Sequence, residues 1–311
     1  MHPELLSRLV DPTDGLPLAL ERGELRAPSG RGYRIYRGIP RFVPDDQYAG
    51  SFSFEWRTHR RTQLDDADHD ESRQSFLART GFDEALVRDK RVLDAGVGSG
   101  RYADIALKLG AAEVIGLDLS LAVESAQENL GRDPRFGVVQ ADVFAPPFAD
   151  ESFDLIYSIG VLHHTPAPRL AFERLVRLLR PGGRIAVYLY VDSPTHVVSD
   201  AIRLVTTRLP PAQLYRLVTS VQPILDGLSR TRAGRLLMRW LPQSGHPRQD
   251  WRVLDNFDWY SPRYQYRYRD AEEIGAWFVG AGLVDVRPLS VPICMSGRKP
   301  VSRAPSESRV G

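Results

Sequence analysis

Cysteine and lysine are nearly absent from this chain of 311 residues. The single cysteine, Cys294, has no second cysteine for a disulfide and cannot by itself supply a cysteine metal site. We expect it to be a small buried residue in a late strand. The basic residues are almost all arginines, because the only lysines are Lys90, Lys108 and Lys299. A disulfide scaffold and a cysteine-rich zinc protein are therefore excluded.

Long apolar runs and a large excess of charge are also missing. No apolar stretch approaches the roughly 20 residues of a membrane span, and the N-terminus lacks the charged-then-apolar pattern of a secretion signal. We therefore expect a soluble, cytoplasmic protein with no membrane partner. The net charge of +2 gives no electrostatic case for nucleic acid as a partner. With 42% hydrophobic residues, the chain can bury at least one sizeable core.

A regular alternation of strand and helix patterns runs through residues 89–190. Strands are predicted at 91–95, 113–118, 136–142, 153–160 and 184–190, and helices at 101–109, 120–130 and 167–179. Later in the chain, a helix is predicted at 270–281 and strands at 283–289 and 291–296. Strands that are apolar on both faces and separated by helices form a parallel sheet covered on both sides. The sequence thus predicts an α/β fold with a doubly wound, mostly parallel sheet.

Composition divides the chain into parts. We predict a β-rich unit at 1–45, a helical lid or linker at 46–88, a main domain at 89–300 with a helical insert at 191–262, and a disordered tail at 301–311. Within the linker, Asp70 is expected to cap a helix that runs toward Gly81.

The strongest local motif is VLDAGVGSGR at residues 92–101, where an apolar strand ends at Asp94 and enters a glycine-rich turn. Gly96, Gly98 and Gly100 allow a tight turn and a close approach of a ligand to the backbone, and the next helix presents its N–H groups. An ordinary strand-to-helix turn is the alternative. A dinucleotide site is disfavoured, because the pattern G-x-G-x-x-G counted from Gly96 ends on Arg101. Asp94 would also repel a pyrophosphate, whereas it suits the ammonium of an amino acid.

Two further acids end the next two predicted strands, at equal spacing. Asp118 is placed to accept hydrogen bonds from ribose hydroxyls, or else to serve as a helix N-terminal acid before Ser120. Asp142 is placed to accept a hydrogen bond from an adenine amine, with the Val143 backbone on the ring edge, or else to shape a turn. Three acidic strand tips in one βαβαβ run favour a nucleoside with a positively charged tail.

Four segments resemble the class I S-adenosylmethionine-dependent methyltransferases: VLDAGVGSGR, VIGLD, QADVFAPPFADESFDLIYSIGVLHH and LLRPGGRIAV, which together span residues 91–190. The resemblance implies a seven-stranded Rossmann-like sheet and S-adenosyl-L-methionine as cofactor. It also implies that the methionine moiety lies on Asp94, Ala95 and the Gly96–Gly100 loop, the ribose on Asp118 and Leu119, the adenine on Asp142 and Val143, and the sulfonium beside Ser158 and Ile159. Val97 stands where the family usually has Cys or Thr.

Residues 9–43 resemble a degenerate zinc-ribbon module that precedes some methyltransferase domains. The match is carried by Leu25, Tyr33, Ile35 and the run at 38–42. The positions of the four cysteines hold Asp11, Asp14, Ala27 and Gly30. Because Ala and Gly supply no ligand, we expect no metal in this unit.

Aromatic residues before the first strand of such enzymes often close over the cofactor. Phe54, Trp56 and Arg57, in SFSFEWRTHR, are the lid candidates, and Trp56 is included in the predicted cofactor site. Packing of these aromatics against the sheet is the alternative.

Methyl transfer from a sulfonium is an in-line displacement in which positioning and desolvation do most of the work. His163 and His164 follow a predicted strand and are the candidates for a general base; a structural turn is the alternative. The acceptor is expected to contact Asp255, Asp258, Trp259 and Tyr260, near the end of the insert, although aromatics of this kind also suit an interface.

The sequence therefore predicts an enzyme that methylates a small-molecule acceptor, for example a secondary metabolite or a quinone-like compound. An RNA or protein methyltransferase and a non-catalytic cofactor-binding subunit are the alternatives. A nicotinamide dehydrogenase is disfavoured by Asp94 and Arg101.

Overall fold

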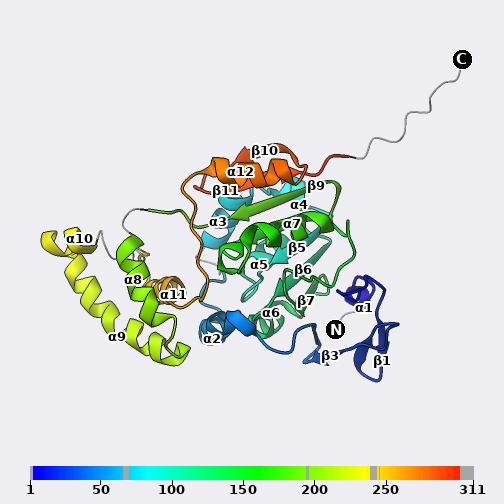
Figure 1. The fold of residues 1–311 in the computed structure, drawn as a ribbon, viewed down its shortest axis with the longest axis horizontal. Coiled ribbons are helices and arrows are strands. Elements are labelled where there is room, and N and C mark those ends of the chain that lie inside the picture. The colour runs from blue at the N-terminus through cyan, green and yellow to red at the C-terminus, as the bar shows by residue number, and fades with distance from the viewer. Residues whose placement is uncertain (1–2, 66–69, 194–195, 239–243, 245, 302–311) are drawn as a thin grey trace, which may run out of the picture.

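A computed structural model describes residues 3–65, 70–193, 196–238, 244 and 246–301 of the chain. Apart from Val301, the predicted tail at 301–311 lies outside the described residues. Within the described part, the strands form one sheet of eleven, in the order β1-β2-β3-β4-β7-β6-β5-β8-β9-β11-β10 (Figure 1).

The central part of the sheet is the predicted doubly wound one. Its parallel strands are β7 (Phe136–Gln140), β6 (Glu113–Asp118), β5 (Arg91–Ala95), β8 (Phe153–Ile159) and β9 (Leu179–Tyr188). The antiparallel β11 (Cys294–Arg298) lies between β9 and β10 (Val284–Pro288). The chain runs outward from β5 to β7 and then returns to β8 on the other side of β5, which places a topological switch point between β5 and β8. The predicted seven-stranded sheet is confirmed, and Cys294 is buried in β11.

The strands are apolar on both faces because helices cover both. On one face, Val92, Val114 and Val138 pack in a core shared with α3 (Glu71–Thr80), α4 (Glu84–Val87), α5 (Arg101–Lys108) and α6 (Ala122–Leu130). The next residue of each strand, Leu93, Ile115 and Val139, points to the other face, as the two-residue period of a strand requires. That face is covered by α7 (Pro168–Leu178) and α12 (Ala271–Gly280).

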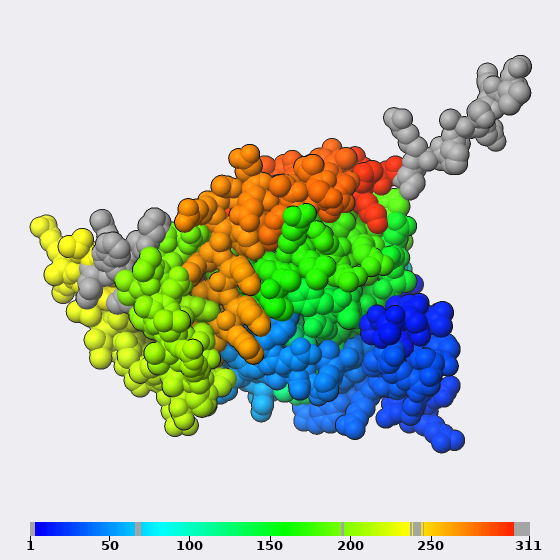
Figure 2. All heavy atoms as spheres, viewed as in Figure 1, coloured from blue at the N-terminus to red at the C-terminus, as the bar shows by residue number. Residues whose placement is uncertain are grey.

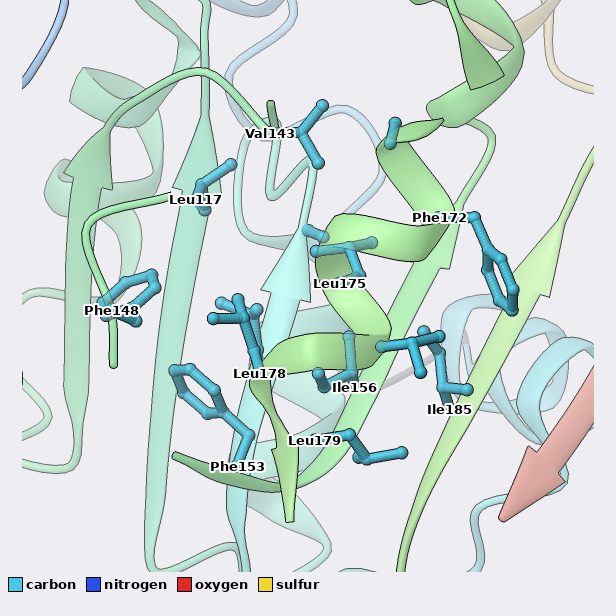
Figure 3. Packing of buried hydrophobic residues seen from close by; sticks show 14 of the residues in the cluster. Leu117, Val143, Phe148, Phe153, Ile156, Phe172, Leu175, Leu178, Leu179 and Ile185 are labelled. Atoms are coloured by element: carbon cyan, nitrogen blue, oxygen red, sulfur yellow. The ribbon is translucent and has the colours of Figure 1, made fainter. Parts of the chain in front are cut away.

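Helix α7 shows how this cover is built (Figure 3). Leu175 and Leu178 point from the helix toward Ile156 and Phe153 of β8, and Phe172 lies further along the same helix. These side chains are essentially inaccessible to water, and burial of each contributes about 1.5–3 kcal/mol. This packing fixes the position of β8 relative to β5 along the strand direction. It therefore sets where the C-terminal ends of the two strands meet.

Helix α3 begins differently from the prediction. Asp70 occupies the N-cap position, but its carboxylate accepts a hydrogen bond from the side-chain amide of Gln74 (2.8 Å) and none from a backbone N–H of the first turn. The Asp65 carboxylate accepts instead from the backbone N–H groups of Ser72 (2.8 Å) and Arg73 (3.0 Å). The capping acid thus comes from the preceding loop, while Gly81 ends the helix in a left-handed conformation (φ +66°), as expected.

The N-terminal unit extends the sheet instead of standing apart (Figure 2). After α1 (Pro3–Leu6), the strands β1 (Ala19–Glu21), β2 (Glu24–Arg26), β3 (Gly32–Tyr36) and β4 (Ile39–Arg41) form an antiparallel meander. β4 then pairs in parallel with β7, where the Arg41 guanidinium donates to Gln140 Oε1 (2.8 Å) and the Phe42 N–H donates to the Gln140 carbonyl (2.8 Å). The unit therefore covers the β7 edge.

A buried carboxylate organises this unit. Asp11 is inaccessible to water, and its oxygens accept hydrogen bonds from the Arg31 guanidinium (2.8 and 2.9 Å), the Tyr33 hydroxyl (2.9 Å) and the Thr13 N–H (2.8 Å). Although burial alone would raise the pKa of Asp11, these donors hold it below its usual value. Asp11 is one of the residues that stand at the cysteine positions of the resembling zinc ribbon. Within the described residues, no group of three His, Cys, Asp or Glu is placed to hold a metal ion.

Helices also build a cap beside the sheet (Figure 1). They are η1 (Gln47–Ala49), α2 (Gly50–Thr58), α8 (His196–Thr206), α9 (Pro211–Ser229), α10 (Arg232–Met238) and α11 (Gln249–Tyr260). Helix α2 contacts α6, α9 and α11, so it lies between the sheet domain and the insert. None of the helices in the described residues is long and apolar enough to cross a membrane.

The Asp11 network yields a stability prediction. Asp11→Ala leaves the Tyr33 hydroxyl and the Thr13 N–H without their acceptor, and we expect a loss of about 2–3 kcal/mol in the free energy of unfolding. Urea denaturation followed by circular dichroism measures it. The matched change Glu24→Gln removes an exposed pair with Arg26 and should stay within about 0.5 kcal/mol of wild type. Equal effects of the two changes would show that Asp11 does not organise the unit.

Candidate functional site

A cavity of about 630 Å³ opens at the carboxyl ends of β5, β6 and β8, at the switch point of the sheet. The loops after these strands form one side of it, and α2 and α11 contribute another wall. Its size and its mixture of apolar and charged walls are those of a small-molecule site.

The glycine-rich turn after β5 forms the floor of the cavity. Gly96, Gly98 and Gly100 all have positive φ values (94°, 53° and 93°), which strongly favour glycine. A Cβ atom on Gly96 would overlap the side chain of Val161, and one on Gly98 would lie 3.3 Å from the indole of Trp56. Gly96 and Gly98 line the cavity, whereas Gly100 does not, and a Cβ atom there would overlap the side chain of Leu130.

Asp118 ties the turn to the tip of β6. Its Oδ2 accepts the Gly98 N–H (2.9 Å), and its Oδ1 accepts the N–H and the hydroxyl of Ser120 (2.8 and 2.7 Å). Burial raises the pKa of the Asp118 carboxyl, and these donors oppose the shift. A carboxylate has about four lone-pair sites, so three internal bonds leave room for a ligand hydroxyl. Asp118 and Leu119 both line the cavity.

Asp94 lies beneath the turn and not on the cavity surface. It is 3% exposed, and the Tyr157 hydroxyl donates a hydrogen bond to its Oδ2 (3.0 Å). Burial, together with the nearby charge of Asp118, raises the pKa of Asp94 to about 8 against the opposing effect of the Tyr157 bond. Ala95, which follows it, does line the cavity. The Asp94 side chain thus links β5 to β8 through Tyr157.

Val143 and Asp142, which were predicted to contact the adenine, also differ in whether they line the cavity. Val143 lines the cavity, whereas the Asp142 carboxylate accepts the N–H of Phe144 (3.0 Å) and shapes the turn after β7. Burial raises the pKa of Asp142. Ser158 is fully buried, and its hydroxyl donates to the Ala95 carbonyl (2.8 Å), so it links β8 to β5 instead of facing the cavity.

Of the three lid candidates, one reaches the cavity. Trp56 lines it and covers Gly98. Phe54 packs against Tyr215 and Phe257 of the insert, with ring centroids 5.6 and 5.7 Å apart, and Arg57 is exposed at the end of α2. The alternative of core packing therefore applies to Phe54, although its partners are helices and not the sheet.

The paired histidines occupy different places. His164 lines the cavity, with Nδ1 placed 2.9 Å from the Tyr264 carbonyl and Nε2 buried without a partner. Burial lowers the pKa of His164 to about 4. His163 stacks on Tyr190 with centroids 3.9 Å apart, outside the cavity lining, and burial lowers its pKa as well. Both rings are neutral in this environment.

The predicted acceptor residues come together on α11. Asp255, Asp258 and Trp259 line the cavity, and Tyr260 does not. Asp258 accepts a hydrogen bond from the Tyr190 hydroxyl (2.6 Å), and the Trp259 ring stacks on that of Tyr190 at 5.5 Å and 17°.

Several cavity residues were missed by the sequence reasoning. Phe52 precedes Glu55 by three residues and Trp56 by four on α2, so its helical spacing to Trp56 was a readable signal. Arg79 on α3 and Tyr190 after β9 carried no such signal, because only the folded sheet brings them to the cavity.

Comparisons with known proteins show the family of the chain. The methyltransferase domain family matches residues 93–187. The chain is 30% identical over 214 residues to trans-aconitate 2-methyltransferase of Variovorax paradoxus, a match that covers 68% of this chain and 73% of that protein. It is 33% identical over 137 residues to demethylmenaquinone methyltransferase of Clavibacter sepedonicus, over 44% of this chain and 55% of that protein.

A solved structure, the Burkholderia thailandensis 1,6-didemethyltoxoflavin-N1-methyltransferase, is 17% identical with a TM-score of 0.46, covering 89% of this chain and 99% of that one. For several of the curated relatives, the matched region spans about half of their length.

The raised pKa of Asp94 gives a pH prediction for the ligand-free protein. A carboxyl with a raised pKa stabilises the fold below pH 4, where it is protonated in both states, and this contribution is lost as pH rises from about 4 to about 8. Asp94→Asn mimics the neutral form, so its stability relative to wild type should rise between pH 5 and pH 8 by at least about 1 kcal/mol. Denaturant titrations at the two pH values measure this difference, and a difference that does not change with pH would contradict the assignment.

Proposed function

The chain belongs to the S-adenosylmethionine-dependent methyltransferase family, and on this premise we propose that it transfers a methyl group to a small-molecule acceptor. One observation carries the proposal. The glycine turn and Asp118 line the same cavity as the acidic and aromatic residues of α11. One side has the groups that suit an adenosyl cofactor, and the other offers room for a second molecule.

The residues present fit S-adenosylmethionine. When bound, it supplies a methyl group already activated on a sulfonium. We propose that the free lone pair of Asp118 accepts a ribose hydroxyl while its bond to the Gly98 N–H keeps the turn in place. Leu119 and Val143 would enclose the adenine, and Trp56 would close over the methionine side of the turn.

Other predicted residues act through their neighbours in this proposal. Asp94 links β5, which leads into the turn, to β8 through Tyr157, Asp142 sets the conformation that presents Val143, and Ser158 holds β8 against β5. None of these three side chains lines the cavity, so we assign them positioning roles.

His164 is the better of the two histidine candidates for contact with the acceptor. If Nδ1–H donates to the Tyr264 carbonyl, the lone pair of Nε2 remains free to accept a hydrogen bond. A pKa of about 4 makes the ring a weak base, so we propose that it orients the acceptor more than it removes a proton. His163 would support Tyr190 by stacking.

The curated relatives support a metabolite acceptor in general terms. Their names give trans-aconitate and demethylmenaquinone as the molecules methylated, and these differ greatly in charge and size. We propose that the helices α8–α11 of the cap select the acceptor in this chain, because Asp255, Asp258 and Trp259 belong to α11.

We also propose that residues 9–43 form a metal-free relative of a zinc ribbon. Asp11, at a position where the ribbon has cysteine, would replace the metal by its bonds to Arg31, Tyr33 and Thr13.

Calorimetry of S-adenosylmethionine binding tests the proposed cofactor site. Wild type should bind, and Asp118→Ala should lower the affinity at least about tenfold, or 1.4 kcal/mol, because the ribose acceptor and the anchor of the Gly98 N–H are both lost. The control Glu128→Gln changes an exposed acid of α6 that pairs with Arg60 and should leave the affinity unchanged. A wild-type chain that binds no S-adenosylmethionine would end the proposal.

Trp56 gives an independent test of the same site. Cofactor binding should change the tryptophan fluorescence, and Trp56→Phe should remove most of this change while keeping the affinity within about threefold, because a ring still covers Gly98. Trp56→Ala should lower the affinity further. A fluorescence change that survives in both variants would place the lid elsewhere.

A further inference from the structure

Three carboxylates meet in the cavity wall that α2 and α11 provide. Glu55 comes from α2, and Asp255 and Asp258 come from α11, which contacts α2. Their charges act on one another, since Asp258 and Asp255 both raise the pKa of Glu55. This cluster is separate from the acids at the strand tips.

Glu55 is a buried acid, and one of its carboxylate oxygens, Oε2, has no hydrogen-bond partner among the described residues. The side chain is 1% exposed, and yet the residue lines the cavity. Asp255 and Asp258 each accept one hydroxyl hydrogen bond, from Ser244 (2.5 Å) and Tyr190 (2.6 Å). In the part of the chain that the structure describes, no ion pair reaches any of the three.

The nearest cations are engaged elsewhere. The Arg203 guanidinium acts on Asp258 through its field but donates its hydrogen bonds to the carbonyls of Trp259 (2.5 Å) and Pro262 (2.7 Å). Arg101, which lines the same cavity, donates to the Ser72 hydroxyl (2.9 Å) and lies over the Trp251 ring. His246 and Arg101 act on Asp255 through their fields as well, but none of these cations forms an ion pair with the cluster within the described protein. The ionised form of the cluster is therefore costly, because buried carboxylates without a paired cation are unfavourable.

Aromatic rings stand beside the carboxylates. Tyr190 donates its hydroxyl to Asp258, and its ring stacks on Trp259, the next residue of α11. Phe52 lies one helical turn before Glu55 on α2 and also lines the cavity. The faces of Tyr190 and Trp259 are taken up by each other, by His163 and by Arg267. The carboxylates can therefore pair with the charge of an organic cation, while the rings offer apolar contact to the rest of it.

We propose that the acceptor carries a basic amine, bound as its cation by Glu55, Asp255 and Asp258. This inference rests on the proposed function, because it names the substrate class of the same cavity. The amine supplies the missing partner of Glu55 and the missing counter-charge of the cluster. It also explains why a wall of the insert concentrates acids that would otherwise destabilise it.

Cation binding has a measurable proton signature. Burial raises the pKa of Glu55 well above its usual value and that of Asp258 to about 6, so burial favours the protonated form of both carboxyls. A bound ammonium favours the ionised carboxylates, and the complex should therefore release protons into the buffer.

Calorimetry on the full chain saturated with S-adenosylhomocysteine tests the proposal with matched probes. The phenyl set is 2-phenylethylamine, 2-phenylethanol and 3-phenylpropionate; the indole set is tryptamine, tryptophol and indole-3-propionate. At least one amine should bind about tenfold or more tightly than its alcohol, and its acid should bind more weakly still. Titrations in two buffers with different heats of protonation should show proton release with the amine only. Absence of a preference for the amine in both sets, including absence of binding, would overturn the proposal.

Variants locate the binding. Glu55→Gln keeps the shape of the protonated acid, so it should fold and bind S-adenosylhomocysteine within about twofold of wild type, yet lose at least about fivefold in amine affinity and most of the proton release. Asp258→Asn gives a second, independent arm with the same expectation. Glu173→Gln, an exposed acid of α7 that pairs with Arg169, is the matched control and should behave as wild type.

Two other results would contradict the inference without touching the proposed function. One is a Glu55→Gln variant that loses S-adenosylhomocysteine affinity and keeps amine affinity, since the cluster would then serve the cofactor. The other is tight binding of Mg²⁺ or Ca²⁺ that Glu55→Gln removes. Failure of the wild type to bind S-adenosylhomocysteine at all would instead count against the proposed function.

Discussion

The hydrogen bond from the Gly98 N–H to the Asp118 carboxylate holds the cavity floor in its shape. It joins the turn after β5 to the tip of β6, across the parallel pairing that sets Asp94 beside Gly116 and Ala95 beside Leu117. The turn needs positive φ at three glycines, and such a backbone is stable only when its surroundings fix it. Asp118 fixes it through Gly98, and the bond of Asp94 to Tyr157 joins the strand that leads into the turn, β5, to β8.

Buried carboxylates recur around this cavity, and each is costly without a partner. At the strand tips the cost is offset by backbone and hydroxyl donors, as it is for Asp118. On the cap side it is offset only in part, because Glu55 has an unpartnered oxygen. A protein that keeps acids in such a place gains from positively charged ligands, which restore the charge balance on binding. The sulfonium of the proposed cofactor would be such a ligand at the strand tips. The proposed amine would be one at the wall formed by α2 and α11.

The central strands and helices could be predicted because parallel strands are apolar on both faces and read clearly in sequence. Strands β5 and β6 match their predicted bounds, and Asp118, Leu119 and Val143 reach the cavity as expected. Three features depend on tertiary contacts that no local pattern encodes. Ser158 turns to the Ala95 carbonyl, Asp65 replaces Asp70 as the cap of α3, and β4 joins the edge of β7 through a single register pair. Tyr190 and Asp258 meet across 68 residues, so their bond was equally hidden.

The central claim is that an adenosyl cofactor lies on the turn between β5 and β6. A crystal structure of the chain soaked with S-adenosylhomocysteine tests it most directly. The account predicts ribose hydroxyls within hydrogen-bond distance of Asp118, with the adenine between Leu119 and Val143 and the indole of Trp56 over the turn. Ligand density at another place, or a fully occupied ligand whose ribose does not reach Asp118, would contradict it.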